Sequence, residues 1–92
     1  MSEYMEIETD TTENPNVMQF YTNLTLAVET VERYGSVEEM EEGSALAQAL
    51  AFVEGLVALE IDGKEMLVTS DGEMPWHIII SEISAIVKDF FL

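Results

Sequence analysis

Few side chains in this sequence could perform chemistry. His77 is the only histidine and there is no cysteine, which excludes thiolate nucleophiles, Cys-ligated zinc and iron–sulfur clusters held by this chain's own thiolates. A Ser–His–Asp site would require His77 to meet Asp71 and a nearby serine, and nothing in their spacing demands that arrangement. We therefore predict no enzyme, no catalytic residue and no resident metal or cofactor. His77 is expected at the surface or partly buried.

A short acidic run offers the next candidate chemistry. Glu38, Glu39, Glu41 and Glu42 could gather around a hard cation, but the sequence has no D-x-D-x-D-G loop and no histidine nearby. We interpret the run as the solvated face of a short helix. The glycines are scattered singly and form no phosphate-cradling loop, so nucleotide binding is not expected.

Charge and hydropathy limit the partners. Three Lys plus Arg against 19 Asp plus Glu give a formal net charge of −16, which repels the phosphates of nucleic acids and anionic membranes. A basic protein surface would be attracted, although acidity also serves solubility alone. The start, MSEYMEIETD, lacks the regions of a secretory signal, and no apolar run approaches the roughly twenty residues of a membrane span. We predict a cytoplasmic chain that binds neither nucleic acid nor membrane.

The elements that hold these groups are organised around the weakly charged stretch Ser44–Ile61. The chain has 92 residues, 48% of them hydrophobic, which suits one domain over residues 1–92 with one core. Ser44 can cap a helix through its hydroxyl, and Gly55 can stop that helix in a left-handed conformation. The extended apolar run Leu56–Ile61 then predicts a buried strand.

Two hairpins and a short helix are expected around this stretch. Residues 4–22 alternate in polarity on both sides of an Asn- and Pro-rich turn, which predicts a first hairpin. Met66–Thr69 follows an Asp-Gly-Lys turn and should return antiparallel to the strand that ends at Ile61. Ser36 and Glu39 have capping-box spacing, so each side chain should satisfy the other's backbone N–H at the start of a short helix.

The last segment predicts an amphipathic helix that opens near Pro75 and lies across the sheet. Its apolar residues recur at helical spacing, namely Trp76, Ile79, Ile80, Ile83, Ile86, Val87, Phe90 and Phe91. Trp76 is therefore interpreted as a core residue and not as a ligand-stacking one. Ile78 falls on the polar side at about 100° per residue, and an exposed isoleucine there would indicate a protein contact.

The segment Leu24–Tyr34 is ambiguous. A helical stripe of apolar residues fits its periodicity, whereas its threonine, valine and tyrosine content favours a strand. Periodicity alone slightly prefers the helix.

Three separated motifs resemble the N-terminal domain of Nfu/NifU-like iron–sulfur scaffold proteins. The first, Asn14-Pro15-Asn16-Val17-Met18-Gln19-Phe20, is similar to the family's N-P-N-x-hydrophobic-K-F hairpin. The second runs from Ser44, Leu46 and Leu50 to Gly55, Leu56 and Leu59, and is similar to S-P-L-A-x-x-L-F-x-I-x-G-V-x-x-V. The third joins Leu67-Val68-Thr69, Trp76 and Asp89-Phe90-Phe91, similar to I-T-V-T, a tryptophan and D-F-F.

The chain departs from the family pattern at four positions within or next to these motifs. Glu13 and Ala45 stand where the family usually has proline, Gln19 where it has lysine, and Ala51 where it has phenylalanine. Phe52 could compensate for the last difference.

The resemblance implies an α+β fold, a single two-layer domain. Its antiparallel sheet would combine two hairpins with a middle strand at Leu26–Tyr34, under two main helices on one face. In the complete family proteins a separate domain with a C-x-x-C pair holds the cluster, and these 92 residues contain no cysteine. The resemblance therefore implies a non-catalytic adaptor that acts through protein contacts in cluster assembly or delivery.

The sequence leaves several alternatives for the function, and it indicates candidate residues for partner binding and for structural roles. The partner could be a C-x-x-C NifU-type scaffold or a client apoprotein with a basic surface. The alternative is a stand-alone structural or regulatory domain outside cluster biogenesis. A third possibility, a small-ligand binder, would need a pocket that the sequence does not indicate. We assign partner binding to Ile78 and Phe52. The motif residues with an expected structural role are Asn14, Pro15, Asn16, Phe20, Ser44, Leu46, Leu50, Gly55, Trp76 and Phe90.

Overall fold

The computed structural model describes residues 6–24, 26 and 31–91. Its elements in chain order are β1 (Ile7–Thr11), β2 (Val17–Thr22), β3 (Glu32–Tyr34), α1 (Val37–Glu41), α2 (Ala45–Leu50), β4 (Leu56–Asp62), β5 (Glu65–Ser70) and α3 (Trp76–Phe91). The first predicted hairpin is present as β1 and β2, and the second as β4 and β5. Tyr4 and Met5, with which we expected the first hairpin to open, lie outside the described residues.

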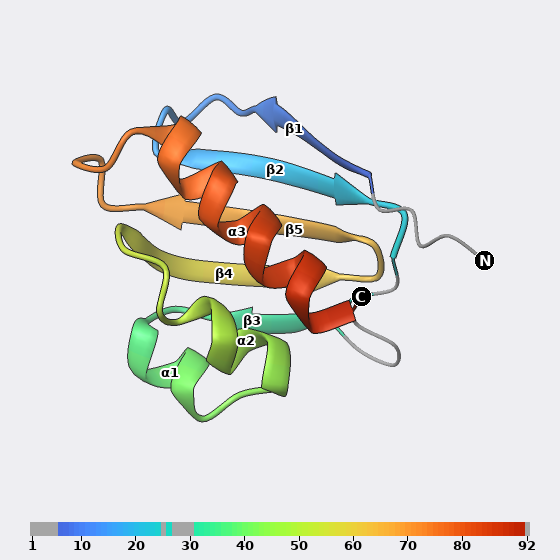
Figure 1. Cartoon of the computed structure of the whole chain (residues 1–92). Coiled ribbons are helices and arrows are strands. Elements are labelled where there is room, and N and C mark those ends of the chain that lie inside the picture. Colours follow the sequence, from blue (N-terminus) through green and yellow to red (C-terminus); the bar gives the residue numbers. More distant parts are fainter. Residues whose placement is uncertain (1–5, 25, 27–30, 92) are drawn as a thin grey trace.

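The five strands form one sheet in the order β1-β2-β5-β4-β3, and every neighbouring pair is antiparallel. The two hairpins therefore meet through β2 and β5, and β3 pairs with β4 at the far edge (Figure 1). The sheet with its helices confirms the predicted α+β class. The strand β3 is third in chain order, and it lies at one edge of the sheet.

Helix α3 crosses one face of the sheet, and α1 and α2 lie at the end of the sheet that carries β3 (Figure 1). The inner face of α3 is fully buried at Ile79, Ile83 and Val87, and α2 adds Leu46 and Leu50 to the same core. Phe90 is the exception to the predicted stripe, because its side chain is 45% exposed in the last turn of α3. Helical spacing places Phe90 on the inner side, but burial also needs a neighbouring element at that level of the helix.

The helix caps follow the predicted chemistry with one change. The Ser44 hydroxyl accepts from the Ala47 N–H at 3.2 Å, and the Ser36 hydroxyl accepts from the Glu39 N–H at 3.2 Å. The Glu39 carboxylate accepts from the Gly35 N–H at 3.0 Å, one residue before the expected partner at Ser36. Both serines are confirmed as N-caps, and the glutamate half of the capping box is shifted by one residue.

Gly55 adopts the predicted left-handed conformation, but in a different place relative to the helix. Helix α2 ends at Leu50, and Gly55 with φ +90° turns the chain into β4. A Cβ on Gly55 would also lie 2.7 Å from the Cβ of Met74. Glycine is therefore required both by the backbone angle and by the close approach of the segment that leads into α3.

The ambiguous segment is a strand where it is described. Glu32–Tyr34 pairs with β4 as β3, so the strand implied by the family resemblance is confirmed there and the helix favoured by periodicity is wrong. Leu26 is buried, and its N–H donates to the Gly63 carbonyl at 2.7 Å. The part of the prediction at positions 25 and 27–30 lies outside the described residues.

Candidate protein-contact surfaces

The Asn-Pro-Asn motif builds a tight turn between β1 and β2. The Val17 N–H donates to the Asn14 carbonyl at 3.0 Å, which closes a β-turn with Pro15 at its second position. The Asn14 side-chain oxygen accepts from the Asn16 N–H at 2.9 Å. Both bonds use side chains and backbone groups of the motif itself, so the turn can form from local sequence.

This turn is attached to the start of the last helix. The Trp76 indole Nε1 donates to the Pro15 carbonyl at 2.9 Å, and the Ser70 N–H donates to the Asn16 carbonyl at 2.7 Å. Trp76 is half-buried against the core, as expected of a packing residue. The first and third family motifs therefore meet at one end of the sheet.

The second motif reaches the same end through Gly55, which lies against Met74. A hollow of about 240 Å³ between the motifs is lined by Pro15, Asn16, Ser70, Gly72, Glu73, Met74, Pro75 and Trp76. Its backbone groups at positions 15, 16 and 70 are already hydrogen-bonded within the chain. This end of the molecule joins the elements together, and the purely structural role of its motif residues stays a prediction.

Tyr34 makes a second junction that the sequence did not reveal. Its hydroxyl donates to the Glu32 carboxylate at 2.6 Å and accepts from the Ser44 N–H at 3.2 Å, which ties β3 to the start of α2. A Cβ on Gly43 would collide with the Tyr34 ring. The sequence signal for this contact was Gly43, a single glycine directly before the N-cap residue Ser44. That signal did not identify Tyr34 as the side chain in contact.

The helical layer exposes three large apolar side chains at and beside α2 and α3. Phe52, in the turn after α2, is 84% exposed, and Phe90 and Ile78 on α3 are 45% and 39% exposed. A groove of about 320 Å³ lies between the two helices and is lined by Ala49, Ile86, Asp89 and Phe90. Both predicted partner-binding residues, Phe52 and Ile78, are thus accessible to solvent. Phe52 stands out, because a phenylalanine gains little from folding when most of it stays in water.

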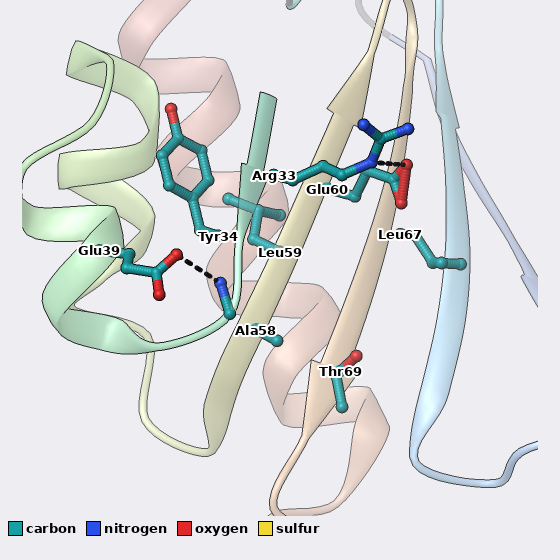
Figure 2. Close-up of a pocket in the computed structure, with 9 residues that line it drawn as sticks. Arg33, Tyr34, Glu39, Ala58, Leu59, Glu60, Leu67 and Thr69 are labelled. Carbon is teal, nitrogen blue, oxygen red and sulfur yellow. Dashed lines mark hydrogen bonds and ion pairs between the residues drawn. The ribbon is translucent and has the colours of Figure 1, made fainter. Parts of the chain in front are cut away.

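The other face of the sheet carries a second hollow of about 280 Å³ at the β3 end (Figure 2). Ala58, Leu67 and Thr69 line it, and Glu39 borders it from α1. At its rim the Arg33 Nε donates to the Glu60 carboxylate at 3.3 Å, and this ion pair joins an exposed arginine to a partly exposed glutamate. Such a pair adds little stability and can rearrange when a partner binds.

The chemical sites that we considered and did not predict from the sequence are not assembled in the described residues. His77 is exposed, and no group of three or more His, Asp or Glu side chains among the described residues is arranged to hold a metal ion. None of the described helices is long and apolar enough to cross a membrane. The remaining motif residues Phe20, Leu46 and Leu50 are buried core residues with 0 to 3% exposure.

Comparisons with known proteins agree with this architecture. The family model described as scaffold protein Nfu/NifU N terminal matches residues 7–92. The solution structure of a NifU-like protein from Saccharomyces cerevisiae superposes with a TM-score of 0.77 at 23% identity, covering 97% of this chain and 82% of that one. The crystal structure of protein SAV1430 from Staphylococcus aureus superposes with a TM-score of 0.70 at 18% identity, covering 87% and 94%. No protein of curated function matches the chain significantly.

The similarity to the solved structures shows the fold, and the match to the family model shows the family. The match includes the Asn-Pro-Asn turn, the capped helix α2, Gly55 and the opening tryptophan of α3, which the structure brings together at one end of the sheet and along its helical layer. The chain therefore belongs to the Nfu/NifU N-terminal family, which is linked to iron–sulfur cluster biogenesis.

Proposed function

We propose that this chain is a non-catalytic accessory domain that works in the cytoplasm by binding a protein involved in iron–sulfur cluster assembly or delivery. The absence of cysteine from the 92 residues leaves no thiolate to hold a cluster. Membership of the Nfu/NifU N-terminal family supports a role in iron–sulfur cluster biogenesis. What remains for these residues is to recognise the protein that carries or receives the cluster.

The observation that carries the proposal is the exposure of Phe52. Complete burial of a phenylalanine side chain contributes about 1.5–3 kcal/mol, and at 84% exposure Phe52 gains little of this from the fold. Aromatic residues are enriched among the few side chains that dominate binding energy at protein interfaces. Phe52 therefore has the properties of an anchor that is buried when a partner binds.

Ile78 in the first turn of α3 and Phe90 in its last turn provide further exposed apolar area on the helical layer. The groove between α2 and α3 offers a concave surface for a partner's own apolar side chain. The partner we infer is a NifU-type scaffold with a C-x-x-C pair, or a client apoprotein, with a basic surface that the charge of −16 would attract.

The test measures binding of a C-x-x-C scaffold from the same host to wild type, Phe52→Ala and Ile78→Glu by titration calorimetry. We expect Phe52→Ala to weaken binding at least tenfold, in line with an anchor worth about 1.4 kcal/mol or more. Val57→Ala is the matched control, because Val57 is also exposed (37%) but lies at the start of β4, and not on α3 or in the turn after α2.

Three further results decide the proposal. Circular dichroism should show the native fold in every variant, since Phe52 and Ile78 are exposed. Equal affinities for wild type, Phe52→Ala and Ile78→Glu would contradict the helical contact. If the scaffold binds and the chain changes neither its cluster assembly nor its cluster transfer, the domain has a protein-binding role outside biogenesis.

A further inference from the structure

The sheet face opposite α3 has a defined pattern of side chains. The buried residues Met18, Phe20, Val68 and Met66 alternate with residues that point to the other side. The register places Gln19 beside Leu67, and Leu67 beside Glu60, which itself pairs with Arg33. No described helix covers this row, and Leu67 in its centre is half-buried.

Two adjacent hollows lie on this face. The smaller, of about 130 Å³, is lined by Gln19, Glu60, Asp62, Glu65 and Leu67. The larger, of about 280 Å³, includes Ala58, Leu67 and Thr69 in its lining (Figure 2). Glu60 and Leu67 belong to both, so one hollow rich in carboxylates adjoins one with an apolar floor.

Two carboxylates of the smaller hollow lie opposite each other, and their electrostatic repulsion is unfavourable. Asp62 and Glu65 are directly opposite in the register of β4 and β5, and like charges in this position destabilise a sheet. Glu65 accepts from the Gln19 amide at 3.1 Å, a neutral donor. Lys64 lies in the turn between the two acids, but within the described residues neither Asp62 nor Glu65 forms an ion pair.

The same sign of charge extends along this face. Glu8 and Asp10 on β1 are register partners of Tyr21 and Gln19 and so point to the same side. Arg33, engaged with Glu60, is the basic side chain that the described strands contribute to the row. A cationic occupant would therefore relieve the repulsion between the acids, whereas an anionic occupant would increase it.

We propose that this open face of the sheet docks a segment of a protein partner that presents a lysine or arginine next to an apolar side chain. The cationic head would lie among Asp62, Glu65 and Glu60, and its aliphatic stem would lie on Leu67. The neighbouring apolar side chain would enter the hollow over Ala58 and Thr69. The domain would then have two contact faces, an apolar one on the helices and an acidic one on the sheet.

This inference deepens the proposed function, because it assigns the basic part of a partner to a stated face. The probe is a short peptide of alternating lysine and valine, with a glutamate–valine peptide of equal length as its counterpart. The peptides are titrated into the isotopically labelled full chain, and backbone amide shifts are followed by NMR.

We expect the lysine–valine peptide to shift the amides of Glu60, Asp62, Glu65 and Leu67, and the glutamate–valine peptide to shift none of them. Asp62→Asn and Glu65→Gln should each weaken binding about threefold, and about tenfold together, as expected for partly exposed charge pairs. The matched control is Glu82→Gln with Glu41→Gln, which removes the same charge from exposed positions on the helices α3 and α1. Binding should also weaken as added salt shortens the Debye length.

Two results would overturn the inference. If the control variant on the helices weakens binding as much as the sheet-face double variant, the peptide responds only to total charge. If the shifts map to α2 and α3, the basic segment docks on the helical layer. Both results leave the contact through Phe52 intact, since that contact is tested with the scaffold protein and with Phe52→Ala, which changes no charge.

Discussion

The Trp76 indole donates a hydrogen bond to the Pro15 carbonyl at 2.9 Å, across a sequence separation of 61 residues. The bond joins the turn between β1 and β2 to the first turn of α3. It links the first strand pair of the sheet to the helix that covers the sheet. Two motifs at opposite ends of the family pattern are therefore parts of one junction.

Removing the indole donor should loosen this junction. Trp76→Phe keeps an aromatic ring against the core and deletes the bond to Pro15, so the free energy of unfolding should fall by about 1 kcal/mol. Urea denaturation followed by circular dichroism measures this change. The neighbouring exposed residue provides the control, because His77→Ala should change stability by less than about 0.5 kcal/mol. Equal stability of wild type and Trp76→Phe would show that water replaces the indole at no cost.

Two glycines separate the cost of a left-handed backbone from the cost of a steric clash. Gly63 has φ +60° and open space around its Cβ position, so Gly63→Ala should cost about 1–2 kcal/mol from the backbone angle alone. Gly55 has φ +90° and Met74 at 2.7 Å, so Gly55→Ala should cost more by an additional 1 kcal/mol or so from overpacking. The comparison uses the same denaturation assay. If the two variants are equally destabilised, Met74 moves aside freely.

Two isoleucines on α3 test which side of the helix faces the sheet. Ile83 is fully buried, and Ile83→Ala should lower the free energy of unfolding by about 2–5 kcal/mol. Ile78 is 39% exposed, and Ile78→Ala should cost much less, about 0.5–1 kcal/mol for the part that is covered. Thermal or urea unfolding of both variants checks the difference. A larger loss for Ile78→Ala would reverse the assigned orientation of the helix.

The absence of thiolates predicts the behaviour of the chain with iron and sulfide. Anaerobic reconstitution should leave no stoichiometric cluster on the purified protein, because such clusters are normally held by cysteine thiolates and the sequence has none. Visible absorbance and bound iron after desalting measure the outcome. A scaffold protein with its C-x-x-C pair, treated in the same way, serves as the positive control. Iron near one cluster per chain would require carboxylate or imidazole ligands that the described residues do not gather.

Local signals in the sequence predicted the elements where short-range chemistry decides the conformation. Ser36 and Ser44 cap helices because a hydroxyl two or three residues ahead of an orphan N–H needs no distant partner. The Asn-Pro-Asn turn closes on itself for the same reason. The buried face of α3 at Ile79, Ile83 and Val87 follows from helical periodicity. Phe52 and Ile78 are exposed, and their role as contact residues stays a prediction.

Tertiary structure decided what periodicity could not. Glu32–Tyr34 is a strand because β4 presents an edge with which it can pair, and that partner is absent from any local window of sequence. Phe90 is exposed although its spacing suits the inner stripe, because burial depends on which element lies opposite it. The joining of the hairpins through β2 and β5 placed Gln19, Leu67 and Glu60 in one row. Sequence alone determined the net charge and the elements other than β3, and the pairing of distant strands determined which side chains share a surface.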